Sequence, residues 1–346
     1  MEKFTEGAIT FFAENKQTRD AKVFFNPSRK FDRDLNILFI NVIGKRKMEG
    51  IDLFGGSGVR SLRLAAETDY FSSITVNDIK TSAIIRKNIA LNKKKLKARI
   101  DVLSMNAQDI YNLQNGYDYV DIDPFGSPVK YMVQALQKVR FGGLLAITAT
   151  DSAALYGKAK KACMLKYGAV SLKTRYFNEI GLRILIKRTE EIANLSDRSI
   201  EPLLFDVRKH YLRVYLRVTA ANINRRIGPI YQCTKCMNRG TECPVKCDVC
   251  GATMKQVGPM WLGKLFDRNL VKRMYDISDG QLKEYLEVMK DETDSVGYYT
   301  TDQMASFLKE KEKKCGLIGC RTVLDDKGFR TDMPLKDLLK EYKNLQ

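Results

Sequence analysis

The sequence has very little histidine: His210 is the only one among 346 residues. Histidine is the side chain that most often moves protons near neutral pH, so mechanisms that need a histidine base or triad are poorly supported. His210 falls within 207–218, a segment with the composition of a β-strand, and we expect it to have a structural role. The chemistry of this chain is therefore expected to rest on carboxylates.

Long apolar runs are absent as well. No segment approaches the roughly 18 consecutive apolar residues of a membrane-spanning helix. Residues 1–15 include acidic side chains and lack the pattern of a signal peptide. These absences predict a soluble, cytoplasmic protein with no membrane partner, and no obligatory protein partner is evident.

Acidic residues are outnumbered: Asp and Glu total 41 against 59 Lys and Arg, which gives a formal charge of +18. Such an excess is typical of proteins that bind a polyanion, although a charge-rich thermophilic surface also produces it. Basic clusters occur at 93–99, 158–161 and 224–226. Each alone is commonly a solvated face, but together with the net charge they favour a track for RNA phosphates.

Cysteine is concentrated in one place, because five of the 8 cysteines lie between residues 233 and 250. Cys233-x-x-Cys236 and Cys247-x-x-Cys250 are separated by ten residues, a spacing that brings four thiolates to one tetrahedral zinc ion. Nothing in the pattern suggests an open catalytic position, so we predict a structural zinc ion. Cys243 is a fifth candidate ligand, and free thiols or a redox pair are the alternatives.

Strand-like and helix-like segments alternate through the first two thirds of the chain. The predicted strands are 50–54, 73–77, 99–103, 117–122, 144–148, 200–207 and 211–219, and the predicted helices are 32–43, 59–67, 81–91, 129–139 and 177–194. Such alternation with short loops is typical of a parallel sheet covered by helices, and the last two strands read as an antiparallel pair that closes it. The predicted fold class is α/β, with a doubly wound, mainly parallel seven-stranded sheet.

The pattern changes after residue 221, where cysteine, glycine and proline become frequent and periodicity is lost. The elements predicted beyond this point are two helices at 281–289 and 301–311 and a hairpin at 316–329 with its turn at 326–328. We therefore predict two domains. The first spans 1–224 and includes an N-terminal extension; the second spans 225–346 and is a smaller mixed domain that contains the zinc ribbon-like segment 233–250.

A glycine-rich loop, Gly55-Gly56-Ser57-Gly58, follows the strand that ends near Asp52. Glycines there let a ligand approach the backbone closely, and Asp78, twenty residues after Gly58, is placed to accept ribose hydroxyls. The loop lacks both G-x-G-x-x-G and the Walker lysine, and Asp52 is suited to face a methionine amine. S-adenosylmethionine is therefore favoured over a nicotinamide cofactor, and a turn without any ligand is the remaining alternative.

Asn106 and Ala107 follow the third strand, in a loop that usually lies over the adenine edge in this architecture. Asn106 is a candidate hydrogen-bond partner of the adenine. Asparagine also favours helix N-caps, and the sequence does not separate these two roles.

The fourth strand runs into the loop Asp123-Pro124-Phe125-Gly126-Ser127-Pro128. Two prolines stiffen a loop at the carboxyl end of a parallel strand, where ligands bind in open α/β sheets. Methylation of an exocyclic amine needs a carboxylate to orient the amine and a stacking surface to hold the unstacked base. Asp123 and Phe125 supply these, and the alternatives are an ordinary strand-end acid and a core phenylalanine.

This Asp-Pro-Phe-Gly-Ser-Pro loop, with Thr148-Ala149-Thr150-Asp151 after the next strand, resembles the tRNA (guanine-26, N2) dimethyltransferase family. Further segments carry the resemblance over most of the chain: Asn26-Pro27, 32–34, 58–60, 77–79, Lys166-Tyr167, 178–185 and 258–263. The family implies a class I S-adenosylmethionine-dependent methyltransferase that places one and then two methyl groups on N2 of a tRNA guanine.

By position, the resemblance implies that Arg33 and Arg60 contact the methionine carboxylate of the cofactor or its surroundings. Asp78 would bind the ribose, Asn106 and Ala107 would line the adenine, and Asp123 would orient or deprotonate the amine, with tRNA as partner. The sequence departs from the common pattern at 52–58 and 106–108, which bears on the adenine contacts. A methyltransferase for another RNA or DNA and a non-catalytic zinc-containing RNA-binding protein are the rival hypotheses; intact Asp52, Asp78 and Asp123 argue against the second.

Overall fold

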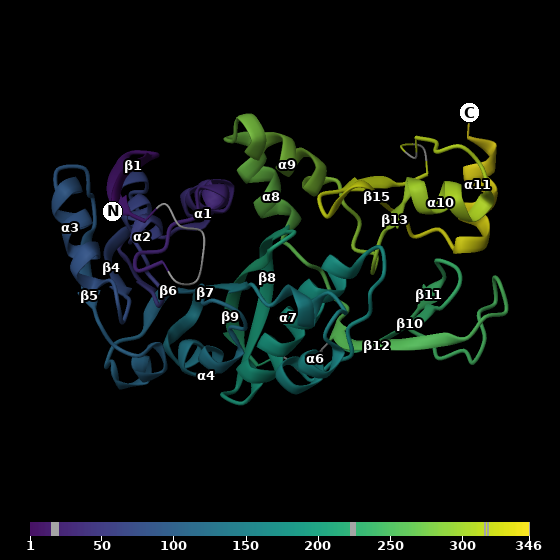
Figure 1. Cartoon of the computed structure of the whole chain (residues 1–346), viewed down its shortest axis with the longest axis horizontal. Coiled ribbons are helices and arrows are strands. Elements are labelled where there is room, and N and C mark those ends of the chain that lie inside the picture. Colours follow the sequence, from purple (N-terminus) through teal and green to yellow (C-terminus); the bar gives the residue numbers. More distant parts are fainter. Residues whose placement is uncertain (15–20, 222–225, 315, 317, 346) are drawn as a thin grey trace.

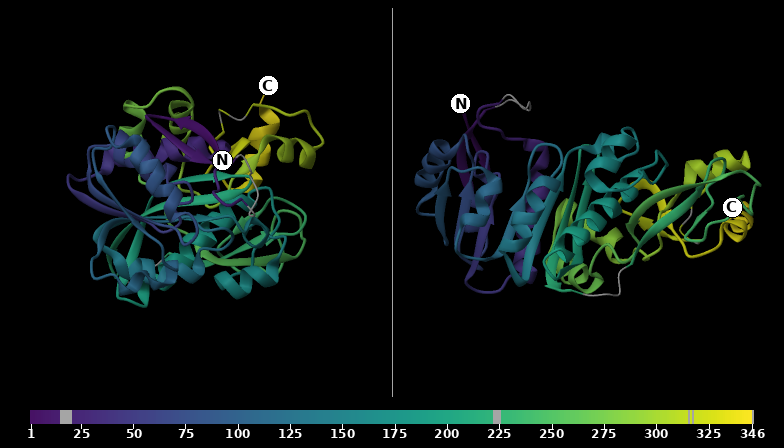
Figure 2. Two further views of the ribbon diagram at one scale, coloured as in Figure 1. Left: turned by 60° about the vertical axis from the view of Figure 1, so that its left-hand side comes forward. Right: turned by 90° about the horizontal axis from the view of Figure 1, so that it is seen from below.

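The computed structural model describes residues 1–14, 21–221, 226–314, 316 and 318–345. The elements are laid out along one axis, with the large sheet at one end and the C-terminal sheets at the other (Figure 1). The right-hand view of Figure 2 shows the C-terminal sheets projecting from the larger body. None of the helices in the described ranges has the length and hydrophobicity of a membrane span.

The large sheet has seven strands in the order β5-β4-β3-β6-β7-β9-β8. Its strands are β3 (Met48–Asp52), β4 (Phe71–Asn77), β5 (Arg99–Leu103), β6 (Tyr117–Ile122), β7 (Val139–Ala149), β8 (Arg198–Arg208) and β9 (Tyr211–Ala220). The strands from β3 to β7 pair in parallel, whereas β9 pairs antiparallel with both β7 and β8. The predicted mainly parallel seven-stranded sheet, closed by an antiparallel pair, is confirmed.

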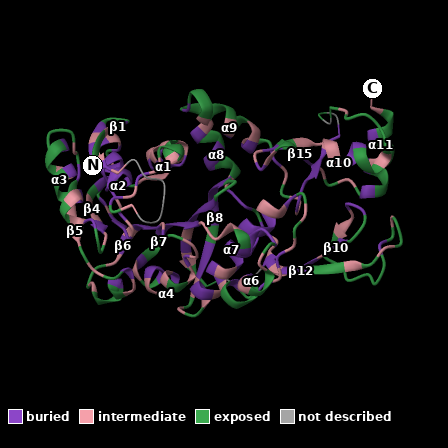
Figure 3. Ribbon diagram, in the orientation of Figure 1, coloured by how far each residue is buried: buried purple, intermediate pink, exposed green. Residues whose placement is uncertain are grey.

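Helices cover both faces of this sheet. On one side lie α1 (Lys30–Ile43), α2 (Val59–Glu67) and α3 (Ser82–Asn92), and on the other α4 (Val129–Lys138) and α7 (Phe177–Asn194) (Figure 1). The short helices are η1 (Pro27–Arg29), η2 (Ala107–Asn112), α5 (Ser152–Leu155) and α6 (Lys160–Tyr167). Buried residues are concentrated along the central strands and α7 (Figure 3), as expected for a sheet covered on two faces.

An N-terminal hairpin, β1 (Glu2–Glu6) and β2 (Ile9–Ala13), was not among the predicted elements. The free edge of β2 pairs with side chains of α3 instead of a third strand. Asn88 accepts from Phe12 N at 2.8 Å and donates to Phe12 O at 3.0 Å, and Asn92 does the same for Thr10 at 3.0 and 2.6 Å. These amides satisfy the edge groups of β2, which would otherwise stay open.

The remainder of the chain contains two small sheets. The first joins β10 (Ile227–Cys233), β11 (Arg239–Gly240) and β12 (Met254–Trp261), and the second joins β13 (Tyr299–Thr300), β14 (Cys320–Thr322) and β15 (Asp325–Arg330). The accompanying helices are α8 (Arg268–Asp276), α9 (Gly280–Lys290), α10 (Thr301–Leu308) and α11 (Leu335–Asn344). The hairpin turn lies at Val323-Leu324, so the prediction of a turn at 326–328 was wrong.

Two sets of contacts join this part of the chain to the large sheet. Tyr285 of α9 donates to Phe205 O of β8 at 3.0 Å, and α8 and α9 both contact α1. On the other side, Arg330 of β15 pairs with Glu179 of α7 at 3.0 Å, and both side chains are at most 1% exposed. The predicted domain boundary at 224/225 stays a prediction, and the segments on either side of it share a core.

Candidate functional site

A cavity of about 380 Å³ opens at the carboxyl ends of β3, β4 and β6, on the side where segment 21–29 passes. Ligand pockets of drug-sized molecules span roughly 300–1,000 Å³. Seven of the predicted site residues line this cavity: Arg33, Asp52, Arg60, Asp78, Asp123, Pro124 and Phe125. The parallel topology brings them together, because the strand ends that carry them meet at one edge of the sheet.

The glycine-rich loop forms the floor of the cavity between β3 and α2. Gly56 and Gly58 have φ angles of +55° and +81°, in the left-handed region that favours glycine. Asp78 fixes the loop, because its Oδ2 accepts from Gly56 N at 3.0 Å while Oδ1 accepts from Lys80 N and Thr81 N at 2.9 and 3.0 Å. A Cβ on Gly56 would meet only Phe24 O, at 3.3 Å, so this backbone is open to a ligand.

Asp52 ends β3 and is buried. Its Oδ2 accepts from Ser61 Oγ at 2.9 Å and its Oδ1 from Phe54 N at 3.1 Å. Burial, reinforced by the nearby charge of Asp121, raises the pKa of Asp52 to about 7. A cation in the cavity would therefore be stabilised by the ionised form of Asp52 and would draw its proton away.

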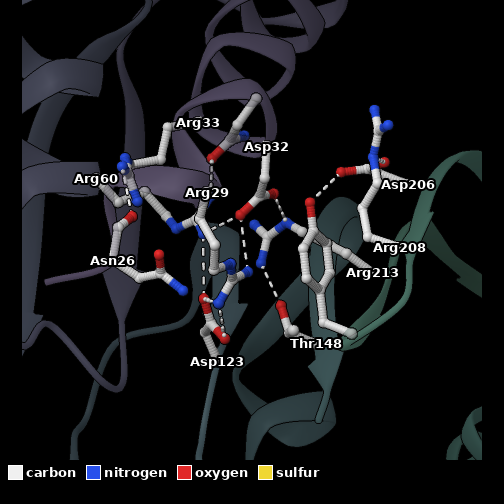
Figure 4. Close-up of polar contacts among 12 residues, drawn as sticks. Asn26, Arg29, Asp32, Arg33, Arg60, Asp123, Thr148, Asp206, Arg208 and Arg213 are labelled. Carbon is white, nitrogen blue, oxygen red and sulfur yellow. Dashed lines mark hydrogen bonds and ion pairs between the residues drawn. The ribbon is translucent and has the colours of Figure 1, made fainter. Parts of the chain in front are cut away.

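Asp123 follows β6 and is held by two arginines (Figure 4). Nη1 of Arg29 lies 2.9 Å from its Oδ1 and 2.8 Å from its Oδ2, and Nη2 of Arg60 lies 3.1 Å from Oδ2. Burial alone would raise the pKa of Asp123, but the charges of Arg29, Arg60 and Arg213 outweigh it and hold the pKa below its ordinary value. Asp123 is therefore ionised at neutral pH.

A buried ion network lies beneath Asp123 and was not anticipated from the sequence. Asp32 of α1 pairs with Arg60 at 2.7 Å and with Arg213 at 3.1 Å, and Asp121 of β6 pairs with Arg213 at 2.5 Å. Asp32, Asp121 and Arg213 have no exposed side-chain surface. Asp121 and Asp123 are two residues apart at the end of β6, so they point to the same face of the sheet.

The two arginines expected at the methionine carboxylate are already paired within the protein. Arg33 contacts Glu6 Oε1 and Oε2 at 2.7 and 2.6 Å and donates to Asn26 O at 3.1 Å. Arg60 contacts Asp32 and Asp123 through Nη2. Both side chains line the cavity, and their contact with a cofactor stays a prediction.

The loop after Asp123 is braced by the segment that follows β7. Gly126 N donates to Thr150 Oγ1 at 2.6 Å, and Thr150 N donates to Gly126 O at 2.9 Å. Ser127 Oγ donates to Tyr167 OH at 2.9 Å, and Tyr167 OH donates to Asp151 Oδ1 at 2.6 Å. These bonds explain why the two motifs at 123–128 and 148–151 occur together.

Phe125 projects from this loop at the cavity mouth and is 52% exposed, so it is not a core residue. The ring of Phe24 meets it edge to face, with centroids 4.9 Å apart and an interplanar angle of 84°. Two aromatic rings beside an ionised carboxylate form a site suited to a planar ligand that carries N–H donors.

Three other residues lie elsewhere than the sequence predicted. Asn106 is exposed and caps η2, because its Oδ1 accepts from Gln108 N at 3.1 Å, and Ala107 is buried in the main core. Neither lines the cavity described above. His210, expected within a strand, instead lies exposed in the β8–β9 turn at the cavity rim.

The four predicted zinc ligands converge at the end of β10. The sulfurs of Cys233, Cys236, Cys247 and Cys250 all lie within 4.8 Å of one another, whereas Cys243 is exposed and is not part of this group. Tetrahedral zinc with Zn–S bonds of 2.3 Å places its sulfurs about 3.8 Å apart. Backbone N–H groups also point at the sulfurs, as from residue 236 to Cys233 Sγ at 3.3 Å, so the four thiolates fit zinc.

Comparisons with known proteins identify the family of this chain. The family model of N2,N2-dimethylguanosine tRNA methyltransferases matches residues 6–342. A tRNA (guanine(26)-N(2)/guanine(27)-N(2))-dimethyltransferase of Aquifex aeolicus is 30% identical over 94% of this chain and 91% of its own. A tRNA (guanine(26)-N(2))-dimethyltransferase of Metallosphaera sedula is 31% identical over 93% of this chain and 88% of its own.

A solved structure gives the same result for the fold. Trm1 from Pyrococcus horikoshii, in complex with S-adenosyl-L-methionine, superposes with a TM-score of 0.86, with 25% sequence identity over 99% of both chains. The two small sheets are therefore matched along with the large one. The chain belongs to the N2,N2-dimethylguanosine tRNA methyltransferase family.

Proposed function

We propose that this protein transfers one and then two methyl groups from S-adenosylmethionine to N2 of guanine 26 in tRNA. Family membership and the two relatives support the reaction. The observation that supports this reaction for this chain is that Asp52, Asp78 and the ionised Asp123 line the same cavity.

The glycine loop and the two loop acids form the proposed cofactor site. S-adenosylmethionine supplies an electrophilic methyl group when bound. Asp52 would hold its ammonium group and Asp78 would accept hydrogen bonds from its ribose hydroxyls. Ile79, which is 60% exposed and lines the cavity, would offer an apolar face to the adenine. Roles for Arg33, Arg60, Asn106 and Ala107 at the cofactor stay predictions.

Asp123 orients the amine of guanine in this proposal. The lone pair of N2 is delocalised into the ring, and an ionised carboxylate that accepts an N2 hydrogen bond offsets the positive charge that develops as the new bond forms. Because its pKa is held low, Asp123 is a weak base. A weak base suffices, since a methylated N2 that still carries its proton is a strong acid, and this proton passes to Asp123 or to water.

The two phenylalanines hold the base. A guanine at a stem junction must leave its stack, at a cost of a few kcal/mol. Phe125 is half exposed and braced by the loop contacts described above, and Phe24 lies beside it at 4.9 Å. Stacking on such rings recovers part of the unstacking cost, because it is worth about 1–3 kcal/mol per base.

Basic side chains outside the cavity are proposed to contact the body of the tRNA. Lys93, Lys94 and Lys95 are exposed, as are Lys158 and Lys160. The expected cluster at 224–226 falls largely outside the described residues. The segment 225–346 is proposed to grip the tRNA together with these surfaces, and its zinc-binding cysteines would hold the β10–β12 sheet together. The cytoplasmic location stays a prediction.

The test is methyl transfer from labelled S-adenosylmethionine to an unmodified tRNA transcript, followed by nucleoside analysis. Label in N2-methylated guanosine is expected with wild type and not with Asp123→Ala. Asp118→Asn is the control, because Asp118 is an acid at the opposite end of the same strand, β6. A transcript with adenine at position 26 should carry no label. If that transcript is still labelled, another guanine is also a target, and guanine 27 is the first to examine.

Absence of label with folded, zinc-containing protein would refute the reaction. If cofactor binding were also absent while tRNA binding survived Asp123→Ala, the protein would be a non-catalytic RNA-binding module.

A further inference from the structure

Arg29 makes the closest contacts to Asp123, yet the reaction proposed above gives this side chain no task. Its Nη1 lies 2.9 Å from one carboxylate oxygen and 2.8 Å from the other, and its Nη2 lies 2.7 Å from Oδ2 of Asp32 (Figure 4). A nitrogen that bridges both oxygens occupies the position where a ligand with two adjacent donors would dock on the carboxylate.

Guanidinium and guanine are chemically alike at this point. N1–H and N2–H of guanine are neighbouring donors on one planar N–C–N unit, and the guanidinium group presents the same unit. We propose that Arg29 stands in for the guanine edge on Asp123 while the site is empty, so that it acts as a gate which the target base must displace. This inference rests on the proposed function and adds Arg29 as a residue that determines specificity.

Among the three arginines around Asp123, Arg29 is the one placed to move. Its Nε is buried without a hydrogen-bond partner in the described structure, so its present position leaves one donor unsatisfied. It projects from the short helix η1, whereas Arg60 and Arg213 project from α2 and β9. Its side chain is also the most exposed of the three, at 12% against 9% and 0%.

Asp32 provides a pivot for this movement. It holds Nη2 of Arg29 independently of Asp123 and has no exposed surface. Arg29 can therefore turn toward the cavity that it lines while its charge stays paired. The ring of Tyr211, 4.6 Å from the guanidinium carbon, gives it a surface along which to slide.

The exchange selects among bases. Both oxygens of Asp123 lose their contact with Nη1 when Arg29 leaves, and guanine offers one N–H donor to each of them. Adenine and cytosine present an acceptor next to their amine, so an oxygen of Asp123 would face another acceptor after the exchange. When the replacement of Arg29 by a base is unfavourable, Arg29 stays on Asp123. The gate thus rejects bases that could stack equally well on Phe24 and Phe125.

The first test compares the kinetics of Arg29→Met with wild type and with Lys30→Met. Lys30 is the neighbouring cation; it pairs with Asp34 and is not among the partners of Asp123. Arg29→Met is expected to lower KM for tRNA by about threefold or more while kcat at high pH is retained. The acid limb of its pH–rate profile should move to higher pH, because Asp123 loses a neighbouring positive charge that holds its pKa low.

The second test measures binding and needs no turnover, so it stands even if the methylation reaction is not found. The protein is loaded with S-adenosylhomocysteine. Its affinity for tRNA with guanine at position 26 is then compared with its affinity for tRNA with inosine at that position. Inosine lacks the N2 amine and offers one donor. Wild type and Lys30→Met should prefer guanine, and Arg29→Met should narrow that preference by about threefold or more.

Either of two results overturns the gate. A fall in kcat of tenfold or more at every pH, in a folded Arg29→Met variant with normal cofactor binding, would make Arg29 a group required in the transition state. An unchanged KM, pH profile and guanine preference would show that its contact with Asp123 has no bearing on the base.

Discussion

The ion pairs around Arg330 hold the β13–β15 sheet against the large sheet, and replacing this arginine measures how firmly. Arg330 contacts Glu292 at 2.7 Å, Glu179 at 3.0 Å and Ser295 O at 2.8 Å, and it is 1% exposed. Removing one partner of a buried ion pair typically costs about 3–5 kcal/mol. Glu179 keeps its second partner, Arg183, at 2.6 Å, whereas Glu292 keeps only neutral donors.

The loss of stability in Arg330→Met therefore depends mainly on Glu292. Burial already raises the pKa of Glu292, and loss of the charge of Arg330 would raise it further, which makes the neutral form of Glu292 easier to reach. This escape limits the loss, and we expect Arg330→Met to lower the free energy of unfolding by about 3–4 kcal/mol.

The assay is urea unfolding followed by the fluorescence of Trp261, the only tryptophan of the chain. Trp261 reports on this junction, because its carbonyl accepts from Arg183 Nη1 at 3.0 Å. Arg140→Met is the control, since Arg140 pairs with acids on the surface and is 42% exposed, and such pairs contribute at most about 1 kcal/mol. A loss below about 1 kcal/mol for Arg330→Met, or one equal to the control, would refute the reasoning.

Three further predictions concern the ligand sites. The affinity for S-adenosylmethionine should rise from roughly pH 6 to roughly pH 8 and then level off, because the ionised form of Asp52, with its pKa near 7, pairs with the ammonium group. Calorimetry should find that protons are released on binding below pH 7. An equally steep rise of affinity with pH in Asp52→Asn would contradict this role of Asp52. Cys236→Ser should lose zinc and expose the β10–β12 sheet to protease, whereas Cys243→Ser should keep one zinc per chain by metal analysis; zinc loss in both would mean that the ligand set is wrong. Phe125→Ala should lower kcat/KM for tRNA by roughly tenfold or more without changing cofactor affinity, since a stacked ring is worth about 1–3 kcal/mol. Phe125→Tyr keeps a ring and should retain most activity. Equal losses of kcat/KM in both variants would contradict a stacking role.

The sheet was predictable because its central strands are buried on both faces. Such strands are rich in apolar residues, as at 144–148 within β7. The predicted bounds of 117–122 coincide with the central strand β6, and those of 99–103 and 177–194 coincide with the edge strand β5 and the helix α7. The hairpin β1–β2 was not predictable in this way, because the free edge of β2 is completed by the side chains of Asn88 and Asn92. The turn at Val323-Leu324 was misplaced because Asp326-Lys327-Gly328 has the composition of a turn but continues strand β15.

The acids of the cavity were predictable from local pattern, because Asp52 ends a strand and Asp78 and Asp123 each directly follow one. Their partners were not. Asp32 and Arg213 meet only through the fold, and the contacts of Arg29 depend on where segment 21–29 crosses the sheet. Residue type alone also left Asn106 undecided, and the structure places it as a helix cap.

The pairing of β2 with α3 has a consequence for synthesis of the protein. The amides that complete this strand lie 76 and 82 residues further along the chain. At translation rates of about 5–20 residues per second, a spacing of 82 residues takes roughly 4–16 seconds to emerge from the ribosome. Until then the strand edge of the hairpin has no hydrogen-bond partner, and a nascent-chain chaperone has that interval in which to bind it.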